Sequence, residues 1–344
     1  MGIYILSFVV AFVVALMATP AAKKLAYKIG AIDIPKDKRR VHKKPVPLIG
    51  GLAIYLGTIL SILLFLPKSQ TNLGIIAGST IIVVLGIFDD KYELKAKVKL
   101  LGQLLASFVV VLSGVRIDWL TNPFGDGMIN IGVFAIPLSI FWIVGITNAM
   151  NLIDGLDGLA AGIASISSGS LFVVSLLNGR YATALITAAV TGAALGFLPY
   201  NFNPAKIFMG DTGAMFLGFI LSAVSIEGAV KSAAAIAIAV PILALGVPVF
   251  DTTFAIIRRI ANKKPIMEAD KGHLHHRLLA LGLTQRQAVF VMYGVSLFLG
   301  LSAILISFTN GAKGYIILII AILAVLWGAD KMGLYGHKAK NMNV

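Results

Sequence analysis

The chain has 344 residues, of which 58% are hydrophobic and only 13% are charged, whereas about a quarter of a typical soluble domain is charged. One soluble core cannot bury so much apolar surface, so the sequence predicts an integral membrane protein. The net charge of +14 is explained by basic loops on one side of a bilayer, which removes the reason to expect a nucleic-acid partner. Disulfides are excluded because the chain has no cysteine.

Long apolar runs predict an all-α protein with about eleven transmembrane helices. Basic residues follow the first run instead of preceding it, so a spanning helix is predicted there and not a cleaved signal peptide. The runs lie at residues 3–20, 49–67, 73–88, 98–115, 132–147, 157–177, 182–199, 212–227, 232–254, 287–308 and 313–329.

The basic residues predict an outer N-terminus and a cytoplasmic C-terminus, because this orientation leaves only five of the 29 Lys and Arg residues outside. Those five are Lys68, Arg116, Arg180, Lys231 and Lys313. All five histidines and all but three of the acidic residues fall on the cytoplasmic side too, which the charge rule does not require. We therefore expect a single polytopic membrane domain, 1–344, with a cytoplasmic active site. The loops expected to build it are 21–48, 89–99, 148–157, 200–211 and 255–286.

The first of these loops contains "DKRRVHKKPVPLIGG", residues 37–51. Its lysines and arginines, Lys43 among them, are suited to charge-assisted contacts with phosphate. Gly50 and Gly51 would allow a close backbone approach. The alternative is an ordinary basic loop beside the membrane.

In "FDDKYELKAKVK", residues 88–99, Asp89 and Asp90 end an apolar run. A helix C-terminus disfavours negative charge, so folding alone does not explain this pair unless neighbouring lysines neutralise it. The functional interpretation is a general base or ligands for a divalent metal.

The segment "NAMNLIDGLDG", residues 148–158, carries a polar residue at every third position. Neighbours three apart share a helix face, while Gly155 and Gly158 predict that the helix breaks here. Asp157 alone is also explained as the N-cap of the next helix. The polar residues are Asn148, Asn151, Asp154 and Asp157.

In "NFNPAKIFMGDTG", residues 201–213, Phe208 lies in a polar loop, where its ring is better placed to stack on a base than to fill a core. Asp211 directly precedes an apolar run, so it is either an N-cap or part of a phosphate or metal site.

The last segment, "KGHLHHRLLALG" at 271–282, gathers four imidazole and guanidinium groups. Zinc is the alternative ligand, but the chain lacks cysteine and the spacing matches neither HExxH nor a zinc finger. Phosphate contact is therefore favoured. The residues are His273, His275, His276 and Arg277.

These segments together offer carboxylates suited to Mg²⁺, cations suited to a diphosphate and an aromatic ring suited to a base. Mg²⁺ prefers oxygen ligands and keeps substrate phosphates in its coordination shell. The combination indicates phosphoryl transfer from a nucleotide to an acceptor held in the lipid.

In this respect the sequence resembles the polyprenyl-phosphate N-acetylhexosamine-1-phosphate transferases. "PLIGG", "FDD", "NAMNLIDGLDGLAAG", "NFNPAKIFMGDTG" and "HLHH" occur in that family's order over nearly the whole chain. The resemblance implies that undecaprenyl phosphate attacks the β-phosphate of a UDP-sugar in the bacterial cytoplasmic membrane. UMP leaves and a lipid-diphosphate-sugar remains. "PVPLIGG" and "HLHHR" are similar to the branch that uses UDP-GlcNAc.

The resemblance also implies residue roles. It makes Asp211 the ligand of Mg²⁺, with Mn²⁺ as the substitute ion, and Phe208 the uracil-stacking ring. Asp89 and Asp90 would deprotonate or position the lipid phosphate. The nucleotide-sugar pocket would be lined or flanked by Asn151, Asp154, Asp157, Asn201 and Lys43.

Three rival functions fit the sequence less well. A phospho-MurNAc-pentapeptide transferase would typically carry a Thr-Pro-Thr-Met-Gly-Gly stretch and three consecutive histidines, which this chain lacks. A transporter would place ionisable groups near mid-bilayer. A CDP-alcohol phosphotransferase needs an arginine where Gly162 stands. The polymer pathway, the choice between direct and covalent attack, and the oligomeric state, including a homodimer, stay open.

Overall fold

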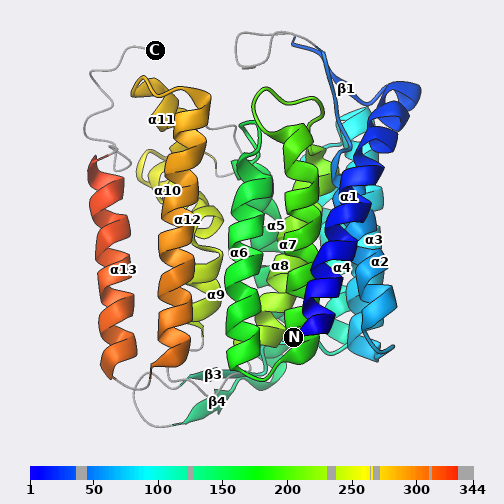
Figure 1. Ribbon diagram of the computed structural model, residues 1–344. Helices are drawn as coiled ribbons and strands as arrows, with labels where there is room; N and C mark the ends of the chain where they lie inside the picture. Colours follow the sequence, from blue (N-terminus) through cyan, green and yellow to red (C-terminus); the bar gives the residue numbers. More distant parts are fainter. Residues whose placement is uncertain are drawn as a thin grey trace.

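The computed structural model describes residues 1–35, 45–121, 127–230, 238–263, 265, 272–309 and 312–331. Its helices run side by side in one bundle (Figure 1). The helices are α1 Gly2–Ile29, α2 Gly51–Phe65, α3 Gln70–Tyr92, α4 Ala96–Leu112, α5 Ala135–Ile153, α6 Leu159–Leu177, α7 Tyr181–Asn201, α8 Gly210–Ser225, α9 Ala239–Ala244, α10 Gly246–Ala261, α11 Leu274–Ala280, α12 Gln285–Phe308 and α13 Ala312–Lys331. A 3₁₀ turn, η1 Gly132–Phe134, precedes α5, and a π-helical segment, η2 Ile226–Val230, continues α8.

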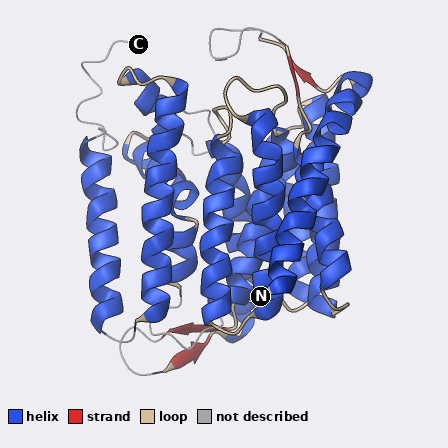
Figure 2. Ribbon diagram, viewed as in Figure 1, coloured by secondary structure: helices blue, strands red, loops and turns tan. Residues whose placement is uncertain are grey.

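The predicted all-α architecture is confirmed apart from two short antiparallel hairpins (Figure 2). One pairs β1 Ile32–Asp33 with β2 Val46–Pro47, and the other pairs β3 Trp119–Thr121 with β4 Met128–Asn130. Each predicted apolar run coincides with a helix, except that the described part of the run 232–254 contains two, α9 and α10, which meet at Leu245.

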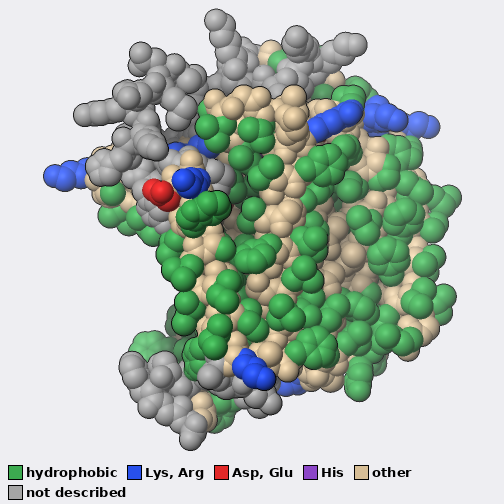
Figure 3. Space-filling view, turned by 60° about the vertical axis from the view of Figure 1, so that its left-hand side comes forward, with side chains coloured by type: hydrophobic (Ala, Val, Ile, Leu, Met, Phe, Trp, Pro, Cys, Tyr) green, Lys and Arg blue, Asp and Glu red, His purple; other side chains and the backbone are tan. Residues whose placement is uncertain are grey.

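Among the described residues, seven helices are long and apolar enough to cross a bilayer. They are α1, α3, α5 with its preceding turn, α6, α7, α12 and α13. Hydrophobic side chains cover the flank of the bundle, and the visible Lys and Arg side chains lie towards its ends (Figure 3). Such a continuous apolar surface belongs in lipid. The count of eleven crossings and the orientation stay predictions.

The first helix is longer than predicted. α1 continues through Lys23, Lys24 and Lys28, which the sequence placed in a loop, and ends at Ile29 with Gly30 as its C-cap. Gly30 has a left-handed φ of 79°, and its N–H bonds to the carbonyl of Ala26. This is a common glycine helix ending, whereas the predicted end at residue 20 followed only the loss of hydrophobicity.

Helix α8 forms the centre of the bundle, in contact with α2, α3, α5, α6 and α7. Small residues allow this close packing. A Cβ added to Gly86 of α3 would lie 2.4 Å from Cα of Thr212, and one added to Gly218 would lie 2.7 Å from Cα of Thr147 on α5. Every residue of α8 except Asp211 is buried. The N-terminal end of this central helix is where the candidate site lies.

Candidate active site

A cavity of about 800 Å³ opens at the end of the bundle where α8 begins. Residues from all five segments expected to build the active site line it. The site residues proposed from the sequence that line it are Asp89, Asp90, Asn151, Asp154, Asp157, Asn201, Phe208, Asp211 and His276. Segments far apart in the chain therefore meet around one space.

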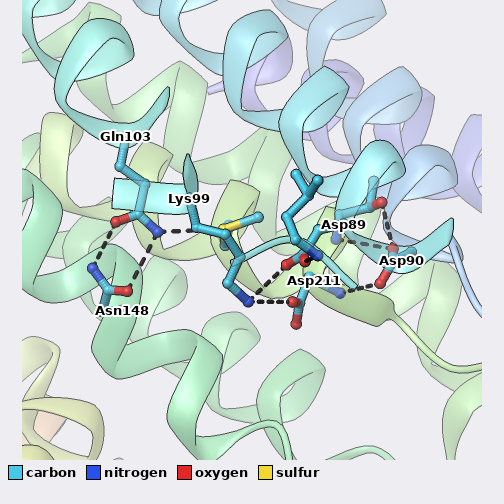
Figure 4. A network of polar contacts seen from close by, with 9 residues as sticks. Asp89, Asp90, Lys99, Gln103, Asn148 and Asp211 are labelled. Carbon is cyan, nitrogen blue, oxygen red and sulfur yellow. Dashed lines mark hydrogen bonds and ion pairs between the residues drawn. The ribbon is translucent and has the colours of Figure 1, made fainter. Parts of the chain in front are cut away.

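Three helices bring an acid–base cluster together in this cavity (Figure 4). The Nζ atom of Lys99, on α4, lies 2.6 Å from Oδ2 of Asp89 on α3 and 2.7 Å from Oδ2 of Asp211 on α8. One ammonium group thus neutralises part of the negative charge of two neighbouring carboxylates. Lys99 was not singled out from the sequence, although a charged residue inside the predicted span 98–115 was the available signal.

Asp90 holds the beginning of α8. Its Oδ1 accepts a 2.7 Å hydrogen bond from the backbone N–H of Asp211. Its Oδ2 accepts hydrogen bonds from the N–H and the hydroxyl of Thr212, at 3.1 and 2.6 Å. A carboxylate at a helix N-terminus is favoured by the helix dipole and satisfies free N–H groups. The geometry therefore makes Asp90 a cap for α8, while its catalytic role stays a prediction.

The two N-cap alternatives considered for the acidic residues are wrong. Asp211 lies in the first turn of α8, whose N-cap is Met209, and its side chain contacts Lys99. The N-cap of α6 is Gly158, not Asp157. Asp211 is thus free of a capping role.

The segment 148–158 breaks as predicted, because α5 ends at Ile153 and α6 begins at Leu159. Asn148 does not join the cavity; its side-chain amide pairs with that of Gln103 on α4, at 2.7 and 3.3 Å. Asn151 and Asp154, closer to the break, do line the cavity.

Asp154 has an unusual electrostatic environment. Burial, together with the negative charges of Asp211, Asp90 and Asp157, raises the pKa of Asp154 to about 8. Each of these influences disfavours the ionised carboxylate. A cation bound nearby would favour ionisation, so Asp154 is poised to respond to a positively charged ligand.

Asp157 and Asn201 make structural contacts at the cavity edge. Oδ2 of Asp157 accepts hydrogen bonds from the side chain of Asn203 and the N–H of Ala205, both at 3.0 Å. Asn201 accepts from the N–H of Gly158 at 3.0 Å and donates to the carbonyl of Ile207 at 3.1 Å. Both side chains therefore fix the loop that leads to Phe208.

Phe208 lines the cavity, and its backbone is hydrogen-bonded to the segment that contains Pro47 and Gly50. Its carbonyl accepts from the N–H of Gly50 at 3.0 Å, and its N–H donates to the carbonyl of Pro47 at 2.9 Å. The close backbone approach expected at Gly50 and Gly51 is present, but the partner is protein and not phosphate. A Cβ on Gly51 would lie 2.0 Å from Cα of Gly213.

Of the four residues in the histidine segment, only His276 lines the cavity. His275 is buried against Gly155, where an added Cβ would lie 2.4 Å from its Nε2. Burial, together with the neighbouring His276, lowers the pKa of His275 to about 3, so its ring is neutral. His273 is buried outside the cavity, and Arg277 donates from Nε to the carbonyl of Gly272 at 3.1 Å.

Lys43 and His42 lie outside the described residues. Within the part of the chain that is described, no group of three or more His, Asp or Glu side chains is arranged to hold a metal ion.

A second cavity, of about 350 Å³, is mostly apolar and lies between α10, α12 and α13. Helix α11 contributes to both cavities, since Leu274 lines the apolar one and His276 the polar one. An apolar space of this kind suits a hydrocarbon chain.

Comparison with known proteins gives consistent matches. Residues 72–229 match the model of glycosyl transferase family 4. The chain is 45% identical to the probable undecaprenyl-phosphate N-acetylglucosaminyl 1-phosphate transferase of Bacillus subtilis, over 98% of this chain and 94% of the relative. It is 37% identical to the decaprenyl-phosphate N-acetylglucosaminephosphotransferase of Mycolicibacterium smegmatis, over 82% and 77%. It is 25% identical to the undecaprenyl-phosphate alpha-N-acetylglucosaminyl 1-phosphate transferase of Escherichia coli K12, over 93% and 86%.

Proposed function

The chain belongs to glycosyl transferase family 4, and we propose that it transfers N-acetylglucosamine 1-phosphate from UDP-GlcNAc to undecaprenyl phosphate. Relatives that share 25% to 45% identity over most of the chain carry this activity in their names, with undecaprenyl or decaprenyl phosphate as the acceptor. The reaction is the first membrane step of a cell-envelope polysaccharide pathway.

The chemistry is a phosphoryl transfer. A phosphate oxygen of the acceptor forms a bond to the β-phosphorus of UDP-GlcNAc, and the bond from that phosphorus to the bridging oxygen breaks. The electron pair leaves with UMP, and undecaprenyl-diphosphate-GlcNAc remains in the membrane. Such transfers depend mainly on positioning and on stabilising charge.

The observation that carries this proposal is the cluster of Asp89, Lys99 and Asp211 inside one large polar cavity at the end of an apolar bundle. The cavity offers a lysine to bind phosphate oxygens and carboxylates to bind a cation. Its position gives a water-soluble donor access from one side, while the acceptor's chain stays in lipid.

The remaining residues have roles in donor binding. Phe208 stacks on the uracil ring, since every base presents a π-face to an aromatic side chain. Asn151 and His276 contact the sugar diphosphate. Asp89 assists or positions the attacking phosphate, and its ion pair with Lys99 keeps it oriented before the acceptor arrives.

Mg²⁺ fits the donors at this site. Asp211 and Asp154 provide hard carboxylate oxygens. Mg²⁺ usually binds through one or two carboxylates plus substrate phosphates, which agrees with the few protein ligands found among the described residues. When bound, Mg²⁺ would neutralise charge on the diphosphate. Mn²⁺, with similar ligand preferences, is expected to substitute.

The cavity faces the cytoplasm in this proposal. Lys24, Lys28 and Arg259 lie at the ends of α1 and α10 on the cavity side, as the positive-inside rule requires of cytoplasmic segments. UDP-sugars and Mg²⁺ are then available on the correct side.

The donor is tested by incubating purified protein and undecaprenyl phosphate with labelled UDP-GlcNAc, UDP-GalNAc or UDP-MurNAc-pentapeptide. We expect UDP-GlcNAc to give the fastest transfer of label into extractable lipid. Faster transfer from UDP-MurNAc-pentapeptide would replace this proposal with the peptidoglycan reaction, and no transfer from any donor would support a transporter instead.

A further inference from the structure

A buried carboxylate outside the polar cavity holds the histidine segment. Asp251, on α10, is 4% exposed, and its Oδ2 lies 2.8 Å from Nδ1 of His273. Its Oδ1 accepts a 2.7 Å hydrogen bond from the N–H of Leu274, the first residue of α11. The N-cap residue of α11, His273, makes no side-chain cap hydrogen bond of its own. Asp251 therefore caps α11 from a neighbouring helix, as Asp90 caps α8.

The position of α11 determines where its other histidines lie. His275, which is 2% exposed, is seated against Gly155 in the loop between α5 and α6. The ring centroids of His275 and His276 lie 4.1 Å apart, and His276 lines the polar cavity. A shift of the first turn of α11 would therefore move His276 relative to the substrate.

We propose that Asp251 is a positioning residue for the transfer reaction, acting through His273 and the first turn of α11 to fix His276 at the cavity. This inference rests on the proposed function. Asp251 lines the apolar cavity and not the polar one, so its contacts reach the polar cavity through the first turn of α11. Burying an ionisable residue is costly unless its partners compensate, and the contacts with His273 and the N–H of Leu274 supply that compensation.

A double-mutant cycle tests the proposal with Asp251→Ala, His276→Ala and both together. The release of UMP gives kcat and the KM for UDP-GlcNAc. We expect Asp251→Ala to lower kcat/KM about 10- to 100-fold, as loss of an orienting partner does in metal sites. Because Asp251 acts through His276, the double variant should stay within about twofold of His276→Ala alone.

Ser139→Ala is the matched control. Ser139 Oγ accepts a 2.9 Å hydrogen bond from the buried N–H of Ile117 near the opposite end of the bundle. Its removal also deprives a backbone N–H of its acceptor, so thermal stability should fall while kcat/KM stays at the wild-type value. Asp251→Asn, which keeps an oxygen for the N–H of Leu274, should recover part of the activity.

The outcomes separate this inference from the proposed function. The positioning role would be overturned if Asp251→Ala kept the wild-type kcat/KM, or if the losses of the two single variants multiplied in the double variant. The proposed function would still stand in either case, as long as the wild-type protein releases UMP. If the wild-type protein itself releases no UMP, the proposed function fails. Should Asp251→Ala not accumulate as folded protein, the same cycle with Asp251→Asn decides between these outcomes.

Discussion

Asp211 is an acidic residue at the start of α8 that does not cap the helix. Lys99 would keep its second partner, Asp89, if Asp211 were neutralised, and Asp90 caps α8 through the backbone N–H of Asp211. Asp211→Asn should therefore leave the unfolding temperature near wild type. It should lower turnover on the order of 10² to 10³-fold, the usual cost of losing an electrostatic stabiliser of the transferring group.

The same variant should need more Mg²⁺ for its residual activity, because a neutral amide is a weaker ligand than a carboxylate. Turnover measured across a Mg²⁺ titration checks this, with Asp118→Asn as a control at a half-exposed acid near the opposite end of the bundle. Retention of more than about half of wild-type turnover at limiting Mg²⁺ would remove Asp211 from the metal site.

Asp154 predicts a pH dependence of stability. Its pKa is raised to about 8 in the folded protein, from an ordinary value near 4, so the folded state holds a proton that the unfolded state releases. The free energy of unfolding of the ligand-free protein should therefore fall as pH rises from about 4 to 8. The side chain of Asp154→Asn cannot ionise, so the free energy of unfolding of this variant should fall less steeply with pH. At pH 8 the variant should unfold at a higher temperature than the wild-type protein, and it should have little activity.

Thermal unfolding in detergent and a metal chelator, at several pH values between 5 and 8, measures this effect. Added Mg²⁺ should raise the unfolding temperature of the wild-type protein at pH 8 more than that of Asp154→Asn. Parallel stability curves for the two proteins would show that Asp154 is not held in its protonated form.

One cause explains why the sequence did not predict three of the interacting residues. Lys99, Thr212 and Asp251 act through contacts between helices that are distant in the chain, as when Lys99 meets Asp211 across 112 positions. Sequence motifs identified most of the carboxylates in the cavity, but they do not say which helices are neighbours. For the same reason the sequence did not show that Asp90 caps α8, and its catalytic role stays a prediction.

At the scale of helices, the glycine contacts around α8 predict a tight limit on side-chain size. A Cβ at Gly86 would lie 2.4 Å from Cα of Thr212, so Gly86→Ala must push α3 away from α8. Because Asp89 and Asp211 sit on these two helices, stability and turnover should fall together.

Gly145→Ala is the comparison, since α5 has open space around that position. Alanine there should leave turnover unchanged and the unfolding temperature equal or higher. Unfolding temperature and UMP release for the two variants test the packing argument, and wild-type behaviour of Gly86→Ala would refute it.

Hydrophobicity predicted the helices because lipid demands apolar runs and internal backbone pairing. It did not predict the division of the described part of 232–254 into α9 and α10, since no polar residue separates the two helices, although Pro241, Gly246 and Pro248 were available signals. The strand pairs were missed because two or three residues per strand carry no detectable alternation.

At the scale of the whole molecule, the proposed reaction requires all five site segments on the cytoplasmic side. The chain has no cysteine, so single introduced cysteines are unambiguous reporters. Lys95→Cys and Lys263→Cys should be protected from membrane-impermeant thiol reagents in intact cells, whereas Lys68→Cys and Lys313→Cys should react. Permeabilised cells provide the control in which all four react, and labelling of Lys95→Cys from outside would place the cavity on the wrong side.

The central claim is that a phosphosugar, and not a sugar alone, moves to the lipid. Purified protein should be given undecaprenyl phosphate, Mg²⁺ and UDP-GlcNAc labelled with ³²P at the β-phosphate. Attack on the β-phosphorus predicts that the label enters the extractable lipid in equal amount with the UMP released, and that Asp211→Asn loses most of this transfer. Label that stays in water as UDP while GlcNAc enters the lipid would contradict the account.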